Sequence, residues 1–189
     1  LVGSLGSYDL SYVKNSFGPR PGEALPFAIR AGWKLGSGTH PKVLLEVFLG
    51  CSQLCASFEN IGWKIIAFDN IKNKCGDLLN DECFLDLLRG IYEMRFVAVH
   101  FGIPCRTRSV ARFPRLRNKN YLVNGLPDLS RSEHLLALEG NELLRRSVFL
   151  ARLAAWTNVL VSFENPRGNL LWEHPEVLCC MEDYSFTKA

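Results

Sequence analysis

The sequence predicts an α/β protein built on a parallel, doubly wound sheet. Continuous apolar runs, typical of strands buried on both faces, recur from residue 42 onward. Segments with apolar residues at helical spacing separate these runs, and such alternation implies right-handed crossovers between parallel strands. With 189 residues, of which 48% are hydrophobic, the chain is long enough for one domain with a substantial core.

The first 41 residues differ in character from the rest. Gly, Ser and Pro are frequent in 1–41 and apolar residues show little periodicity, so we expect an irregular lead-in with one short helix near 24–33. Residues 42–189 form the predicted α/β domain. Because the chain begins with Leu1 rather than methionine, we expect it to be a piece of a longer protein.

Strands and helices are expected to alternate through the domain. The strands are predicted at 42–50, 64–70, 95–101 and 159–165. The helices between them are predicted at 51–63, 79–94 and 141–158, with a long loop before the last one. We expect Gly62 to end the first helix and Asp81 to cap the second, whose apolar face comprises Phe84, Leu87, Leu88 and Ile91.

Residues that follow the predicted strands are candidates for chemistry, because ligands of doubly wound sheets bind beyond the carboxyl ends of the strands. Gly50 stands at the first strand-to-helix turn, where a glycine lets the backbone approach a ligand. Asp69 ends the second strand about 20 residues later, a position suited to ribose hydroxyls. Asp77 lies within reach of the same crevice, and both carboxylates are also compatible with turn formation. No Gly-Lys-Ser/Thr follows Gly50, so a nucleoside-triphosphate P-loop is not expected.

Positive charge is concentrated after the third strand. The net charge of +3 predicts no partner by itself. A window without acidic residues, however, contains Arg106, Arg108, Arg112, Arg115, Arg117 and Lys119. Such a run is either a solvated loop or a surface for an anionic partner.

The seven cysteines predict neither disulfides nor a metal site. Cys55 and Cys83 lie in or beside apolar segments, like small buried hydrophobic residues. There is no signal peptide and no apolar run long enough to span a membrane, so we expect an intracellular, reducing environment and no membrane partner. His174 and the Cys179-Cys180 pair lack the knuckle spacing of zinc ligands, so no metal is expected.

Five short motifs follow one another at the predicted strand ends: "EVFLGCSQL", "FDN", "GDLL", "IPCRTRS" and "FENP". In order and spacing they resemble the DNA cytosine-5 methyltransferases, whose motifs include Phe-x-Gly-x-Gly, Pro-Cys followed by a serine, and Glu-Asn-Val. The resemblance covers roughly residues 42–173. It implies a Rossmann-like, S-adenosylmethionine-dependent methyltransferase fold in which the last strands are lacking, and a nuclear location if the source is eukaryotic.

The resemblance implies methyl transfer from S-adenosylmethionine to carbon 5 of cytosine in DNA, with RNA as the other candidate substrate. Cys105 is then the nucleophile that adds to carbon 6, and Glu164 interacts with the ring nitrogen N3. Positive charge near Cys105 favours its thiolate form, and the target base must leave the duplex. The implied cofactor contacts are Phe48, Gly50, Asp69, Asp77 and Pro104. The implied nucleic-acid contacts are Arg106, Arg108, Ser109, Arg112 and Asn165.

Other hypotheses remain open because the match is incomplete. Ser52, Ile103, Arg106 and Pro166 replace residues usual in the family, and its later motifs have no counterpart before the end of the chain. A catalytically inactive remnant that binds nucleic acid is therefore the second hypothesis. The third is a cysteine hydrolase that uses Cys105 with His100 or His134, although His100 lies on an apolar strand and fits a core residue better. The oligomeric state is left open.

Overall fold

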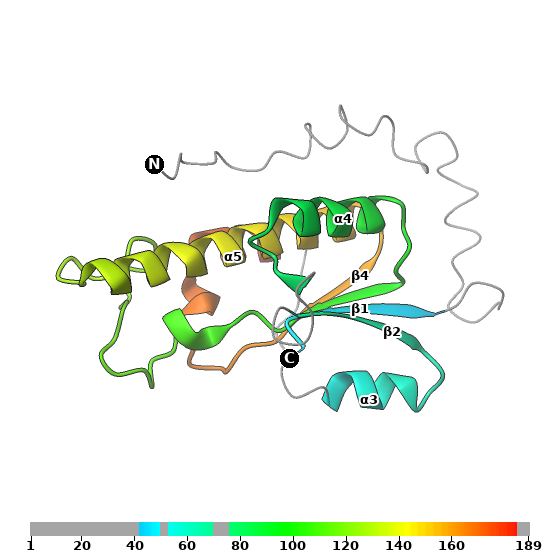
Figure 1. The fold of residues 1–189 in the computed structure, drawn as a ribbon, viewed down its shortest axis with the longest axis horizontal. Helices are drawn as coiled ribbons and strands as arrows, with labels where there is room; N and C mark the ends of the chain where they lie inside the picture. Colours follow the sequence, from blue (N-terminus) through cyan, green and yellow to red (C-terminus); the bar gives the residue numbers. More distant parts are fainter. Residues whose placement is uncertain (1–41, 50–52, 70–75, 185–189) are drawn as a thin grey trace.

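A computed structural model describes residues 42–49, 53–69 and 76–184 of the chain. The lead-in at 1–41, with its expected short helix, lies outside the described residues, as does Gly50. Within the described part, the chain forms a parallel sheet with helices on both of its faces (Figure 1). The predicted α/β class is therefore confirmed.

The described sheet has four strands in the order β2-β1-β3-β4, and every neighbouring pair is parallel. The strands are β1 (Val43–Val47), β2 (Lys64–Phe68), β3 (Ala98–Phe101) and β4 (Leu160–Phe163). Each falls inside a predicted apolar run but is shorter, because the chain turns once the ladder ends. At the end of β1 this turn begins at Phe48, whose φ of 65° leaves extended geometry.

The helices cover the two faces of the sheet unequally. Their bounds are α3 (Gln53–Glu59), α4 (Asp81–Tyr92), α5 (Arg131–Trp156) and α6 (Pro175–Asp183), with short 3₁₀ turns η2 (Cys105–Thr107) and η3 (Leu170–Glu173). Figure 1 shows α3 on one face and both α4 and α5 on the other. The chain thus crosses from β1 to β2 on one face and from β2 back over β1 to β3 on the other. This reversal makes the β1–β3 boundary the switch point of the sheet.

The main core lies between the sheet and the α4/α5 layer. Val47 of β1, Phe101 of β3 and Leu150 of α5 are fully buried in it. Burying a side chain of this size contributes about 1.5 to 3 kcal/mol. β1 is buried along its whole length, as the apolar run predicts, whereas most of β2 is exposed because it is an edge strand with a single neighbour.

Helix α5 begins well before the predicted start at residue 141. Its first residue is Arg131, and Ser130 and Glu133 form a capping box. The Ser130 Oγ accepts from the Glu133 N–H at 3.3 Å, and the Glu133 carboxylate accepts from the Ser130 N–H at 3.0 Å. Hydrogen bonds from Ser130 lower the pKa of Glu133, with a smaller contribution from the charge of Arg112. The prediction was wrong because Ser-x-x-Glu is itself a helix-start signal.

Asn80, not Asp81, caps α4. The Asn80 Oδ1 accepts from the N–H groups of Glu82 at 2.9 Å and Cys83 at 3.2 Å. Asp81 instead accepts from the Arg146 Nη2 at 2.5 Å. Because Arg146 is buried on α5, this ion pair fastens the start of α4 to that helix.

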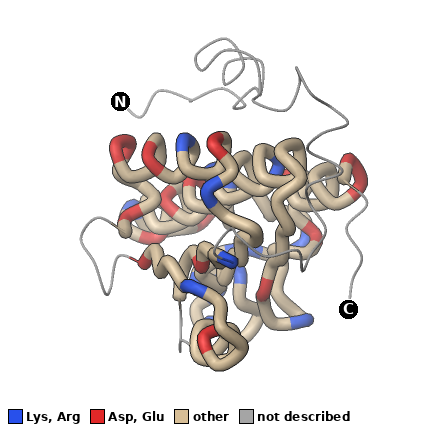
Figure 2. The backbone as a smooth tube through the Cα atoms, turned by 90° about the vertical axis from the view of Figure 1, so that its right-hand side faces the viewer, with Lys and Arg blue, Asp and Glu red and all other residues tan. Residues whose placement is uncertain are grey.

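Charges of both signs are spread over the helical layer (Figure 2). The longest described helix, α5, carries several arginines and glutamates among its 26 residues. Among the described helices, none combines the length and the apolar character needed to cross a membrane.

The assignment of the α4 cap can be tested by substitution. Asn80→Ala removes the acceptor of two helix N–H groups, and we expect the free energy of unfolding to fall by about 1 kcal/mol. Asn80→Asp keeps an acceptor oxygen and should retain the stability of the parent. Urea denaturation followed by circular dichroism measures both, and an alanine variant as stable as the parent would exclude a capping role for Asn80.

Candidate active site

The loops that follow the described strands begin at one edge of the sheet. The Phe48 N–H donates to the Phe68 carbonyl at 2.9 Å, and the Gly102 N–H donates to the Val47 carbonyl at 3.0 Å. On the other side of β3, the Glu164 N–H donates to the Phe101 carbonyl at 2.9 Å. Backbone pairing therefore continues one residue beyond β1, β3 and β4. It holds the first residues of the loops that follow the strands side by side.

The loops after β1 and β3 touch at the switch point. A Cβ added to Gly102 would lie 2.8 Å from the Phe48 carbonyl oxygen, so only glycine fits at this position. Phe48 itself has a φ of 65°, a left-handed conformation that costs a non-glycine residue about 1 to 3 kcal/mol. Backbone strain of this kind is concentrated where a fold holds a functional loop. Phe48 and Gly102 thus fix how closely the Ile103-Pro104-Cys105 loop approaches β1.

A side-chain hydrogen bond joins the loop of Cys105 to the loop of Glu164. The Asn165 Nδ2 donates to the carbonyl of buried Ile103 at 2.6 Å. Cys105 lies two residues after Ile103, is half-buried, and opens η2, where its carbonyl accepts from the N–H of Arg108 at 2.9 Å. Glu164, next to Asn165, has a side chain that is 79% exposed. The fold therefore brings the loops of both predicted catalytic residues to the same edge of the sheet.

His100 is a hydrogen-bonded residue of the sheet face that α3 covers. Its Nδ1 lies 2.8 Å from the Ser162 Oγ, and its Nε2 lies 3.9 Å from a carboxylate oxygen of Glu164. Burial lowers the pKa of His100, and the carboxylates of Glu46 and Glu164 oppose this shift. The prediction that His100 is a satisfied core residue is confirmed. Its hydrogen-bond partner is Ser162, which gives no support to a Cys105–His100 pair.

A buried carboxylate on β1 completes a polar row on the same face. Glu46 is 4% exposed, stands in register with His100, and accepts from the Cys55 thiol at 2.5 Å. This row is not predicted by the sequence reasoning. A signal for it exists, because Glu46 is the single charged residue within the apolar run 43–49.

Asp69, the residue predicted to contact the ribose of a cofactor, is buried in this structure. Asp69, at the end of β2, is 7% exposed. A Cβ added to Gly76 would lie 2.4 Å from the Asp69 carbonyl oxygen, so the chain at Gly76 passes directly over it. Asp77 follows Gly76 in the sequence, and one of its carboxylate oxygens accepts from the Leu79 N–H at 2.9 Å and forms a turn. Gly50, the third predicted cofactor residue on this side, is outside the described residues.

Arg108 was predicted to meet phosphates, but its side chain is directed into the protein. It is 1% exposed, and its guanidinium donates to the Gly140 carbonyl and to the Asn141 Oδ1, both at 2.9 Å. Arg117, from the same run, is 2% exposed and donates to the carbonyls of Leu122, Val123 and Ala137 at 2.6 Å. Both side chains hold the loop against α5 and are removed from any nucleic-acid surface.

Small residues on α5 make this packing possible. Ala137 and Gly140 are buried one turn apart on the helix, and their carbonyls receive the two buried guanidinium groups. A Cβ added to Gly140 would lie 2.4 Å from the Thr107 Oγ1. The loop therefore lies directly on the backbone of α5, where a larger side chain would hold it away.

Burying the guanidinium groups of Arg108 and Arg117 removes two positive charges from water, which lowers the pKa of both groups. Burial, with a contribution from the charge of Arg117, lowers the pKa of Arg108 to about 9, and burial lowers that of Arg117 to about 10. His174 is 3% exposed, and burial together with the neighbouring arginines lowers its pKa to about 4, so it is neutral at pH 7. Within the described part of the chain, hydrogen bonds from these arginines go to neutral acceptors, which offset part of the desolvation cost.

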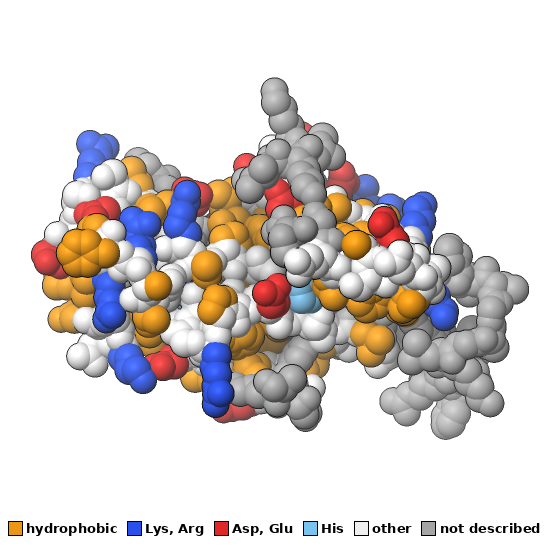
Figure 3. Space-filling view, turned by 90° about the horizontal axis from the view of Figure 1, so that it is seen from below, with side chains coloured by type: hydrophobic (Ala, Val, Ile, Leu, Met, Phe, Trp, Pro, Cys, Tyr) orange, Lys and Arg blue, Asp and Glu red, His pale blue; other side chains and the backbone are white. Residues whose placement is uncertain are grey.

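Exposed cations remain around the loop tip. Arg106 lies 3.7 Å from Glu139, and Lys119 lies 3.0 Å from Glu173. Arg112 and Arg115 form no ion pair with any residue that the structure describes. Ser109, also predicted to contact nucleic acid, accepts from the Ala111 N–H at 3.2 Å within the loop. Figure 3, which views the molecule from below relative to Figure 1, shows most of the basic side chains of that face on its left half, among exposed hydrophobic ones.

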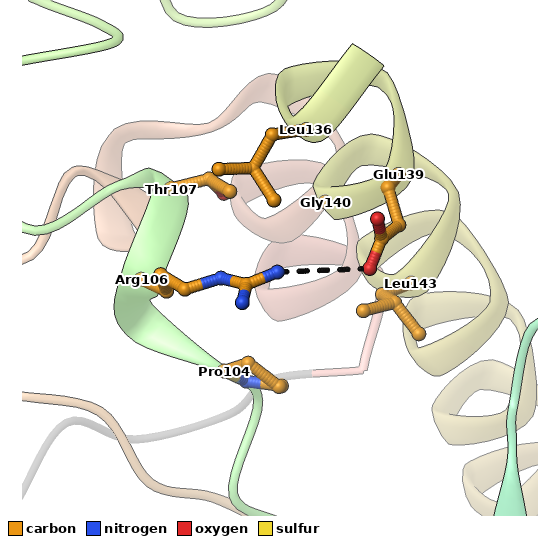
Figure 4. Close-up of a pocket in the computed structure, with 7 residues that line it drawn as sticks. All are labelled: Pro104, Arg106, Thr107, Leu136, Glu139, Gly140 and Leu143. Atoms are coloured by element: carbon orange, nitrogen blue, oxygen red, sulfur yellow. Dashed lines mark ion pairs between the residues drawn. The ribbon is translucent and has the colours of Figure 1, made fainter. Parts of the chain in front are cut away.

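A small pocket opens between η2 and α5, directly after Cys105 (Figure 4). The empty space between its walls is about 260 Å³ when the part that is open solvent is included. Its lining comprises Pro104, Arg106, Thr107, Leu136, Glu139, Gly140 and Leu143. The Arg106–Glu139 ion pair spans it, so both charges are directed to the pocket rather than to the sheet edge.

Comparison with protein-family models, with curated protein sequences and with solved structures finds no match to this chain. Among the described residues, no group of three or more His, Cys, Asp or Glu side chains is arranged to hold a metal ion. The functional interpretation therefore depends on the geometry of the loops at the sheet edge.

The buried role of Arg108 can be tested against its exposed neighbour. Arg108→Ala leaves a cavity and removes the donor to buried acceptors, so we expect the free energy of unfolding to fall by about 2 to 4 kcal/mol. Arg106→Ala, the matched control, should change it by less than about 0.5 kcal/mol, because that side chain is exposed. Urea denaturation measures both, and equal losses would contradict the assigned roles.

The contact between η2 and α5 can be tested at Gly140. In Gly140→Ala the new methyl group meets Thr107, and overpacking should cost about 1 to 3 kcal/mol. This exceeds the gain of about 1 kcal/mol from better helix propensity.

In a Thr107→Ala background the Oγ1 and Cγ2 atoms are absent and only the Cβ of residue 107 remains, 3.2 Å from the added methyl group, so Gly140→Ala should cost much less there. A double-mutant cycle from urea denaturation gives the coupling between the two positions. Coupling near zero would mean that the loop does not lie on the helix as described.

Proposed function

We propose that this chain is an S-adenosylmethionine-dependent cytosine-5 methyltransferase domain that acts on DNA through Cys105. The observation that supports it most directly is the hydrogen bond from Asn165 to the Ile103 carbonyl. It ties together two loops that are distant in sequence and that carry the nucleophile and the carboxylate such a reaction needs. The switch-point position of the Cys105 loop, where doubly wound sheets bind ligands, supports the same proposal.

Cys105 performs the covalent step in this proposal. Its thiolate donates an electron pair to carbon 6 of a cytosine that has left the base stack, and an Sγ–C6 bond forms. The added electron density makes carbon 5 nucleophilic. The bound cofactor supplies the methyl group that carbon 5 accepts. A water molecule from solvent then takes the proton from carbon 5, and the electron pair of that C–H bond expels the Cys105 thiolate and restores the aromatic ring.

Glu164 assists the addition in this proposal. Its exposed carboxyl group, when protonated, donates to the N3 nitrogen of the base and stabilises the electron density that develops there. Asn165 positions this group by holding its loop to Ile103. The Nε2 of buried His100 lies 3.9 Å from a carboxylate oxygen of Glu164.

Two of the residues predicted for the cofactor, Phe48 and Asp69, support this proposal by their position. Phe48 and Asp69 end adjacent strands, and the strained turn at Phe48 packs against Gly102. Asp69 would hold the ribose and Phe48 the adenine side of the cofactor. Since Asp69 is only 7% exposed, a ribose reaches its carboxylate only by displacing what covers it.

A second function, nucleic-acid binding without catalysis, is favoured by the burial of Asp69. A protein with a covered ribose contact, an exposed Arg115 and a half-buried Arg112 would bind phosphates without binding the cofactor. The two functions differ in whether S-adenosylmethionine binds.

Replacement of Cys105 tests the proposed chemistry. Cys105→Ala should abolish transfer of radiolabelled methyl groups to DNA and leave cofactor binding by titration calorimetry unchanged, because only the nucleophile is lost. Cys179→Ala, which removes an exposed cysteine on α6, is the matched control and should retain activity.

Two outcomes would contradict the methyltransferase proposal. Methyl transfer by Cys105→Ala would exclude the covalent mechanism. Absence of heat on addition of S-adenosylmethionine to the parent chain, together with DNA binding that weakens steeply with salt, would favour the non-catalytic function.

A further inference from the structure

An aromatic side chain stands almost fully in solvent at the tip of the arginine-rich loop. Phe113 is 95% exposed, more than any other large hydrophobic residue in the described part of the chain. Its neighbours Arg112 and Arg115 have no ion-pair partner among the described residues, although Arg112 lies close enough to Glu133 to affect its pKa. Exposing a phenylalanine forgoes about 1.5 to 3 kcal/mol of burial energy, which calls for a reason.

The loop that carries Phe113 is held at both ends. Arg108 fastens its start to α5 through the Gly140 carbonyl, and Arg117 fastens its end through the Ala137 carbonyl. Leu116, next to Arg117, is 1% exposed and its carbonyl accepts from the Leu126 N–H at 2.9 Å. The tip is therefore presented from a fixed base, and ordering it on binding costs less entropy than ordering a free loop.

We propose that Phe113 is a stacking platform for an unpaired nucleobase, with Arg112 and Arg115 contacting the flanking phosphates. An aromatic ring flanked by cations suits single-stranded nucleic acid, because bases stack on the ring while the backbone meets the positive charge. The inference rests on the nucleic-acid partner of the proposed function. It assigns to this loop the capture of an unstacked base, separately from any chemistry at Cys105.

The surroundings of Phe113 favour nucleic acid over a protein partner. The core of a protein interface is depleted in charge, whereas the segment that carries this ring has an arginine on each side of it in the sequence, Arg112 and Arg115. The two other cations of the loop, Arg106 and Lys119, are occupied by Glu139 and Glu173. The charge left for an anionic partner is thus concentrated beside the exposed ring.

Binding of a short fluorescein-labelled single-stranded DNA, measured by anisotropy, tests the proposal. Loss of one stacked base costs about 1 to 3 kcal/mol, so Phe113→Ala should weaken binding roughly 5- to 150-fold. Phe113→Trp should retain the affinity of the parent. Ile61→Ala, at an apolar residue that is 67% exposed beyond α3, is the control and should change nothing.

An abasic strand of the same length separates stacking from phosphate contact. The parent should bind it as weakly as Phe113→Ala binds the normal strand, and Phe113→Ala should bind both strands equally. Arg115→Gln should lower the slope of log affinity against log salt by about 0.7, whereas Phe113→Ala should leave that slope unchanged.

The outcomes distinguish this inference from the methyltransferase proposal. Two results would overturn the stacking role. One is that the parent and Phe113→Ala bind the normal strand with equal affinity. The other is that both proteins prefer the normal strand over the abasic strand by the same factor. Self-association of the parent that Phe113→Ala abolishes, without any DNA binding, would assign the ring to a protein interface instead. The binding assay contains no S-adenosylmethionine, and Cys179→Ala, at an exposed cysteine on α6, should bind the strand like the parent, so failure of methyl transfer leaves the stacking result interpretable.

Discussion

The buried guanidinium of Arg108 is the interaction on which the candidate site depends. Its side chain bonds α5 at Gly140 and Asn141, its N–H bonds the Cys105 carbonyl, and its own carbonyl accepts from the Leu170 N–H at 3.2 Å. One residue thus connects the loop after β3, the long helix and the segment after β4. Removing a charge of this size from water costs several kcal/mol, and the two neutral acceptors on α5 offset part of that cost. The loop of Cys105 is positioned by the interior of the protein rather than by contacts at its surface.

A second constraint acts from the sheet. The order β2-β1-β3-β4 places the reversal of direction between β1 and β3, and the strained turn at Phe48 packs against Gly102 there. Neither residue can change freely, since a side chain at 102 would strike the Phe48 carbonyl. The Cys105 loop is consequently held between a rigid sheet edge on one side and the small residues of α5 on the other. This double support fixes the position of the loop, which suits a nucleophile that must meet a base in one orientation.

The sheet could be predicted from the sequence because its signals are local. Apolar runs around Val43–Val47 and Ala98–Phe101 specify buried strands whatever surrounds them, and parallel order follows from alternation with helices. The roles of the arginines could not be predicted in this way. Arg106 and Arg108 are chemically identical neighbours, and only the fold determines that one meets the backbone of α5 while the other meets solvent. Ala137 and Gly140, small residues one helical turn apart, weakly indicate that a loop packs on this part of α5. Small residues at this spacing also occur in helices without such a contact. Asp69 is a second example. Its place after a strand can be predicted from the neighbouring residues, but its burial depends on a segment that packs over it in the fold.

The positive charge available to an anionic partner depends on which arginines are buried and which are exposed. In the sequence the run after Cys105 is uniformly basic. In the folded chain Arg108 and Arg117 are internal, and Arg106 and Lys119 face the carboxylates of Glu139 and Glu173. What remains around the loop tip is Arg112 and Arg115 beside Phe113. A surface with so few unpaired cations releases few counterions, so phosphate contacts alone would give weak affinity with a shallow salt dependence. An aromatic contact adds affinity that salt does not screen, and for this reason Phe113 matters more to binding here than the number of arginines would suggest.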